Sequence, residues 1–127
     1  MNGMTFLAVG MGAALGAWLR WGLGLWLNPL FLTLPLGTLA ANLIGGYLVG
    51  VAVAAFHINA TLPDEAKLFI ITGFLGGLTT FSTFSAEIVA LIQRAQLFWA
   101  FGAASLHLLG SLAMTGLGIL TVQHLNK

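Results

Sequence analysis

The chain has 127 residues, of which 59% are hydrophobic and 6% charged, and its formal net charge is +1. Soluble domains carry about 25% charged residues, so this composition indicates an integral membrane protein. The few Lys and Arg residues cannot form the basic surface that nucleic-acid binding requires, and a chain without cysteine has neither disulfides nor thiolate metal sites. We expect one domain, residues 1–127, that does not bind nucleic acid.

Four apolar stretches are each long enough to cross a bilayer, which takes about 20 residues of helix. Prolines and short polar segments separate them, and the lack of a basic segment before the first stretch indicates a retained span rather than a signal peptide. The sequence therefore predicts an all-α, multi-pass membrane protein with four transmembrane helices. The predicted spans are about 4–27, 36–56, 66–92 and 97–122.

The first span carries a charge. Arg20 lies about two turns before the end of this helix. An arginine at membrane depth is costly, so we expect it either to reach the interface beside the neighbouring tryptophans or to give an aqueous vestibule a fixed positive charge. Gly12 and Gly16 have the GxxxG spacing that lets helices approach closely, and the second span repeats it at Gly46 and Gly50.

The third span contains the segment 76–85, with the sequence GGLTTFSTFS. Glycines disfavour a continuous helix, and non-helical backbone at membrane depth is tolerated only where it is buried in protein or lines a polar cavity. We therefore expect this helix to be broken in mid-membrane within this segment, with carbonyls free to coordinate a cation. Phe81 and Phe84 should share a face, where their positive ring edges can hold an anion.

Other polar side chains lie within the spans. Asn42, in the second span, is expected either to join two helices by a hydrogen bond or to line a polar path. Thr80, Thr83 and Glu87 are spaced to form one stripe of a helix, and an intramembrane carboxylate is a functional candidate. We interpret His107, in the fourth span, as a hydrogen-bonded packing residue. The same span also contains Ser105, Ser111 and Thr115.

The few charges divide evenly between the two sides of the membrane. Lys67 and Lys127 belong to one side, whereas Arg94 belongs to the other, with Arg20 lying towards it. Because positive residues mark the cytoplasmic side, this balance favours insertion in both orientations and hence an antiparallel homodimer. The tryptophans gather towards the Arg94 side, so an inverted pair would have an aromatic belt at each interface.

Three segments resemble the Fluc (CrcB-type) fluoride channel family: 16–21 (GAWLRW), 37–45 (GTLAANLIG) and 76–85 (GGLTTFSTFS). The resemblance covers nearly the whole chain, and the third segment is its most specific part. It implies an antiparallel, dual-topology homodimer in the bacterial inner membrane, with two pores through which cytoplasmic fluoride leaves passively. The implied partners are fluoride, a second copy of the chain and membrane lipid.

The resemblance also implies roles for particular residues. Backbone carbonyls of Gly76 and Thr79 from both subunits would hold one structural sodium ion at the dimer centre, and Arg20 would support the potential of a vestibule. The residues implied along the fluoride path are Asn42, Phe81, Ser82, Thr83, Phe84, Glu87, Ser111 and Thr115.

Other functions compete with the channel. A small four-span, dual-topology multidrug or cation exporter needs a proton-coupled carboxylate, typically in its first span, where this chain has Arg20 and no acid. A non-transporting assembly subunit explains the glycines but not the hydroxyl-rich segment. An intramembrane enzyme is disfavoured because no nucleophile–base pair, metal-ligand cluster or phosphate-binding loop stands at a recognisable spacing.

Overall fold

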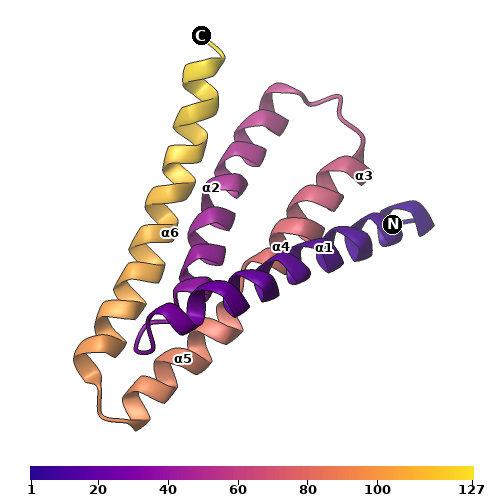
Figure 1. Cartoon of the computed structure of the whole chain (residues 1–127). Helices are drawn as coiled ribbons and strands as arrows, with labels where there is room; N and C mark the ends of the chain where they lie inside the picture. Colours follow the sequence, from indigo (N-terminus) through magenta and orange to yellow (C-terminus); the bar gives the residue numbers. More distant parts are fainter.

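The computed structural model describes all 127 residues, and nearly all of them are helical. The connections alternate between the two ends of the molecule: the 59–63 loop and the C-terminus lie at one end, and the 31–35 and 94–96 connections at the other (Figure 1). The prediction of an all-α protein with four helices apolar enough to span a membrane is confirmed. These segments are Gly3–Leu30, Leu36–Ile58, Asp64–Gln93 and Leu97–Leu125.

The first two helices are fixed by side-chain caps. Helix α1 (Gly3–Leu27) begins with a capping box, in which Asn2 and Thr5 each accept a hydrogen bond from the other's backbone N–H. A short 3₁₀ turn, η1 (Asn28–Leu30), follows it. Helix α2 (Leu36–Ile58) starts after a proline that has no capping side chain. The Asn28 side chain caps α2 instead, because its Oδ1 accepts the N–H of Gly37 at 2.7 Å.

The third span is irregular. Thr79 and Thr80 have extended backbones, with ψ values of 155° and 114°, and interrupt the helix. The interruption lies within the segment 76–85, just after Gly76 and Gly77, which are both helical. The Thr79 hydroxyl bonds back to the Leu75 carbonyl at 2.8 Å. The elements of this span are α3 (Asp64–Lys67), the π-helix η2 (Leu68–Leu75), α4 (Gly76–Leu78) and α5 (Phe81–Gln93).

Glycines set the close contacts between helices. A methyl group on Gly12 or Gly16 would meet the backbone of η2 and α4, so α1 lies directly against the third span. Gly46 and Gly50 face the backbone of α6 (Leu97–Leu125) at Ser111 and Thr115. The close packing predicted from the GxxxG spacing is therefore confirmed.

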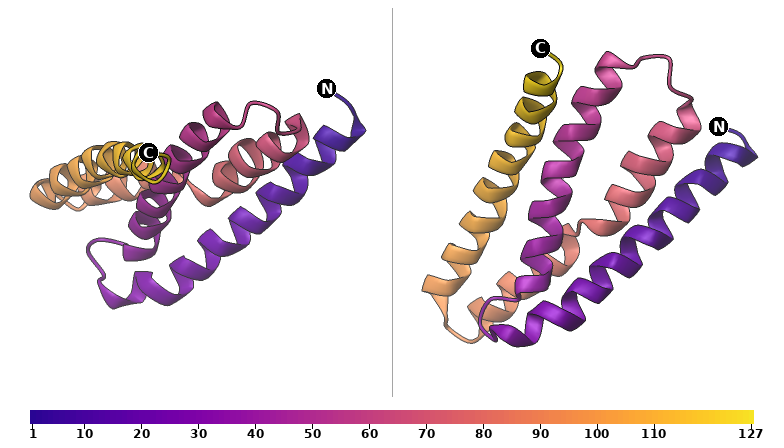
Figure 2. Two further views of the ribbon diagram at one scale, coloured as in Figure 1. Left: turned by 90° about the horizontal axis from the view of Figure 1, so that it is seen from above. Right: turned by 45° about the horizontal axis from the view of Figure 1, so that its top comes forward.

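The helices form two packed pairs that meet at α2. Helix α1 runs along η2 and α4, and α2 runs along α6 (Figure 2). Helix α5 leads to the connection at the foot of α6 and contacts that helix (Figure 1). The side chains of Leu75 and Leu78 are fully buried against Ala41 of α2. This packing holds the interruption at Thr79 and Thr80 beside α2 and α6.

Candidate functional site

A cavity of about 380 Å³ opens between α2, the interruption, α5 and α6. It is lined by aromatic rings and by small polar groups. Four of the residues expected along an ion path meet there, although they come from three separate segments of the sequence: Asn42, Phe81, Phe84 and Ser111. Thr79, Thr80 and His107 also line it.

Asn42 connects α2 to the interruption. Its Oδ1 accepts the N–H of Thr80 at 2.8 Å, and its Nδ2 donates to the carbonyl of the same residue at 3.1 Å. The Nδ2 group also lies 3.1 Å from Nδ1 of His107. Asn42 thus joins helices by hydrogen bonds, which is one of the two alternatives expected for it, and it also lines the cavity.

The two phenylalanines lie on one face of α5, as predicted. Their ring centroids are 5.6 Å apart, and the rings meet edge to face at 63°. Phe81 is 79% exposed, whereas Phe84 is half-buried against the imidazole of His107, with centroids 4.6 Å apart. The edge of a phenyl ring carries partial positive charge, so this face offers weak attraction to an anion.

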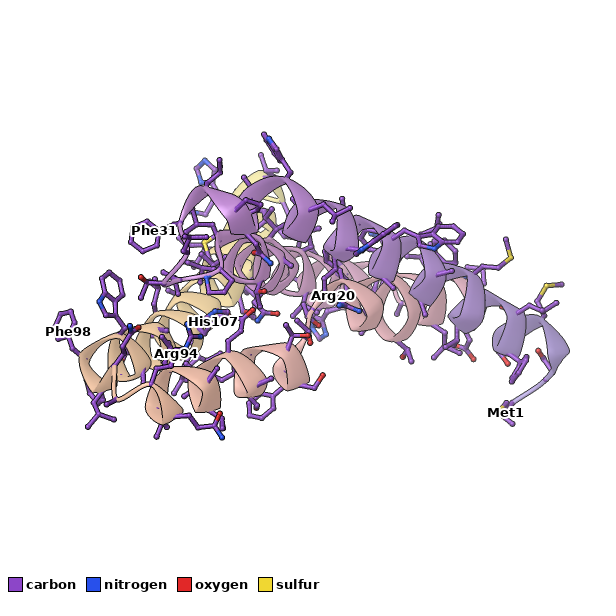
Figure 3. The ribbon with its side chains drawn as sticks, turned by 60° about the horizontal axis from the view of Figure 1, so that its bottom comes forward. Met1, Arg20, Phe31, Arg94, Phe98 and His107 are labelled. Carbon is purple, nitrogen blue, oxygen red and sulfur yellow. The ribbon has the colours of Figure 1, made fainter.

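His107 is the residue of this site that sequence reasoning missed. It is 4% exposed, and its Nε2 is buried without a hydrogen-bond partner. The interpretation as a hydrogen-bonded packing residue holds for Nδ1 alone. A signal was present in the sequence, because His107 stands one helical turn before Ser111 and therefore shares its face of α6. Figure 3 shows the imidazole in the interior of the bundle.

Glu87 and Thr83 lie on the other side of α5 from the phenylalanines. The hydroxyl of Thr38 donates to Oε2 of Glu87 at 2.6 Å. Smaller cavities flank this side: one of about 260 Å³ includes Arg20 and Thr83, and one of about 240 Å³ includes Thr83 and Glu87. A single chain therefore separates the expected path residues onto two faces. The predicted stripe is also shorter than expected, because Thr80 precedes the helix.

Arg20 reaches across to the third span. Its Nε donates to the carbonyl of Gly77 at 3.0 Å, and Figure 3 shows the side chain between α1 and that span. The guanidinium pairs with a carbonyl at the C-terminal end of α4, where a positive charge is favourable.

Two further path candidates lie at the margins. Ser82 is exposed, and its Oγ is 3.4 Å from the hydroxyl of Thr80. Thr115 lies in the contact between α2 and α6, outside the cavity that Phe81 and Phe84 line, and its hydroxyl donates to the Gly46 carbonyl at 2.9 Å.

Comparison with known proteins places the chain in a family. The model of the family described as CrcB-like protein, Camphor Resistance (CrcB), matches residues 7–119. The chain belongs to the CrcB family. The resemblance seen in the three sequence segments is thereby confirmed.

Relatives within the CrcB family are named "Fluoride-specific ion channel FluC". The protein of Dechloromonas aromatica is 66% identical over 122 residues, which cover 96% of this chain and 90% of the relative. That of Nitrosospira multiformis is 68% identical over 118 residues, covering 93% and 92%. That of Pseudomonas putida is 58% identical over 117 residues, covering 92% of each. These names denote ion channels, which are membrane proteins and not enzymes.

The sodium ion implied by the likeness to the CrcB family can be tested against the backbone. In a continuous helix the Gly76 carbonyl would accept from the N–H of Thr80, and the Thr79 carbonyl from that of Thr83. Both donors are diverted: Thr80 N–H donates to Asn42, and Thr83 N–H donates to the Thr80 hydroxyl at 3.1 Å. The two carbonyls named for sodium lose their helical donors, and carbonyls without such donors suit a sodium ion.

Proposed function

We propose that this chain forms a fluoride-selective channel of the bacterial inner membrane, through which cytoplasmic fluoride leaves passively down its gradient. The observation that carries the proposal is the cavity in which the rings of Phe81 and Phe84 lie beside Asn42 and Ser111. The high identity to relatives named as fluoride-specific channels supports the choice of ion.

The chemistry of the cavity suits a small anion. Fluoride is strongly hydrated, so a path must replace its water with short donors and leave no room for chloride. The Ser111 hydroxyl can donate, and the ring edges of Phe81 and Phe84 are weakly attractive. No lysine or arginine lines this cavity, so no full positive charge traps the ion there. Conduction requires such weak binding, because an ion that is held tightly does not leave.

We propose that two chains pair in antiparallel orientation and enclose two pores. The cavity is open along the surface of one chain, where Phe81 is 79% exposed and Gly76 is also exposed. Unpaired backbone groups and hydroxyls facing lipid would be costly, so this face needs a protein or aqueous neighbour. A second, inverted copy would cover this face, with Thr79 and Thr80 near the middle of the third span in both chains.

The polar groups on the other side of α5 extend this path. Thr83 lines both of the smaller cavities, one together with Arg20 and the other together with Glu87, and Arg20 would supply a fixed positive charge at the vestibule. Ser82 and Thr115 flank the cavity and complete the polar track between the two chains. Because Arg20 is bonded to the Gly77 carbonyl, its charge is held beside the path rather than within the Phe81 cavity.

We also propose the structural sodium ion at the dimer centre. The Gly76 and Thr79 carbonyls of both chains would hold it, and no cluster of acidic or histidine side chains competes for the role. When bound, the ion would neutralise these carbonyl dipoles and tie the two interruptions together.

Fluoride and chloride efflux from proteoliposomes tests the proposal. We expect rapid fluoride efflux, negligible chloride efflux, and loss of the fluoride signal in Phe81→Ile. Phe101→Ile is the matched control, because Phe101 is 77% exposed on α6 and does not line the cavity. Absence of fluoride efflux from folded wild-type protein in sodium buffer would refute the channel. Drug-driven proton movement would instead identify a multidrug or cation exporter.

A further inference from the structure

Both the oxygen and the nitrogen of the Asn42 side chain make hydrogen bonds. A carboxamide has two N–H donors and one carbonyl acceptor. In this structure the oxygen accepts from Thr80 N, while the nitrogen contacts the Thr80 carbonyl and Nδ1 of His107. The amide is therefore bonded at both its oxygen and its nitrogen.

These contacts fix the orientation of the amide and the tautomer of the histidine. A backbone N–H can only donate and a backbone carbonyl can only accept, so the Thr80 peptide groups decide which Asn42 atom is oxygen and which is nitrogen. The remaining N–H of Asn42 then faces Nδ1 of His107, which must accept. The ring hydrogen of His107 is consequently on Nε2, the buried nitrogen without a partner.

The same contacts stabilise the interruption of the third span at Thr79 and Thr80. By taking the Thr80 N–H, Asn42 removes the donor that would close a helical turn onto the Gly76 carbonyl. Thr80 is also the N-cap of α5, because its hydroxyl accepts from Thr83 N. The Asn42 amide thus holds the backbone of Thr80, the residue directly before α5, and so positions the start of this helix and Phe81.

We propose that Asn42 is a positioning residue, whose amide clamps the Thr80 backbone and sets the His107 tautomer. This inference rests on the proposed channel function. It makes the geometry of Phe81 and of the Gly76 carbonyl dependent on one side chain of α2.

Nuclear magnetic resonance of labelled full-length protein in lipid nanodiscs tests the clamp without recourse to ion flux. In wild type we expect the backbone N–H of Thr80 to exchange slowly with solvent hydrogen. We also expect the ring hydrogen of His107 on Nε2. Asn42→Ala should speed Thr80 exchange about tenfold, the scale of one net hydrogen bond, and release the tautomer. Asn42→Asp keeps an acceptor for Thr80 N–H but has no donor, so exchange should stay slow while the His107 hydrogen moves to Nδ1.

A control variant and fluoride efflux distinguish failure of the clamp from failure of the proposed channel function. Asn59→Ala, which removes an exposed amide bonded only within α2 to Ala55, should change neither signal. A His107 hydrogen on Nδ1 in wild type would overturn the proposal, as would unchanged Thr80 and His107 signals in an Asn42→Ala protein that has lost efflux. If the wild-type signals are as expected but no fluoride passes, the clamp is supported and the proposed function fails.

Discussion

Gly16→Ala is the substitution whose effect follows most directly from the helix packing. Gly16 is buried where α1 crosses the third span. A Cβ at this position would lie 2.7 Å from the backbone nitrogen of Leu78 and closer still to the carbonyl oxygen of Phe74. Non-bonded carbon contacts need about 3.5 Å, so α1 would have to withdraw by about 1.5 Å to relieve the nearest contact. Backbone atoms cannot swing aside as a side chain can.

A second glycine of the same helix provides the control. Gly22 has no atom within 4 Å of an added Cβ. Alanine is more favourable than glycine in a helix by about 1 kcal/mol, and this gain applies to both substitutions and cancels in their comparison. Overpacking costs about 1–3 kcal/mol, so we expect Gly16→Ala to be less stable than Gly22→Ala by that amount.

Unfolding in mixed micelles measures this difference, and fluoride efflux measures its consequence. We expect a lower unfolding midpoint for Gly16→Ala and slower efflux, because movement of α1 shifts α4 and the interruption beyond it. Gly22→Ala should match wild type or exceed it in stability. Equal stability of the two variants would refute the account of how α1 packs against the third span.

Three further substitutions test other contacts of the site. Thr38→Val removes the 2.6 Å hydrogen bond to Glu87 and should slow fluoride efflux about tenfold, whereas Thr38→Ser should retain it; equal rates would contradict a role for this bond. Thr80→Val removes the N-cap of α5 and should lower the free energy of unfolding by about 0.5–2 kcal/mol, while Thr80→Ser preserves stability. Arg20→Gln should slow fluoride efflux. Arg20→Lys should not restore the rate, because lysine lacks the Nε–H that donates to the Gly77 carbonyl. A wild-type rate in Arg20→Lys would show that the positive charge alone matters.

The apolar helices and their glycine contacts were predictable from the sequence because composition and small-residue spacing determine them locally. Phe81 and Phe84 share a face for the same reason, since both lie within one regular helix. The family could also be predicted, because the segment 76–85 is so specific.

Other features depend on contacts between distant residues and could not be read from local patterns. The interruption lies at Thr79 and Thr80, not at the glycines, because Asn42 of another helix captures the Thr80 peptide groups. The hydroxyl of Thr38 donates to Glu87, and these two residues are 49 positions apart in the sequence. The missed role of His107 has the same origin, since its neighbours Asn42 and Phe84 come from two other helices.

Electrical recording across a planar bilayer tests the central claim most directly. Wild-type protein would be placed between solutions with a fluoride gradient and equal chloride, in sodium buffer. The account predicts a steady current that reverses near the equilibrium potential of fluoride and is unaffected by a proton gradient. A current that reverses at the chloride potential, or fluoride movement that requires a proton gradient, would contradict a passive fluoride channel.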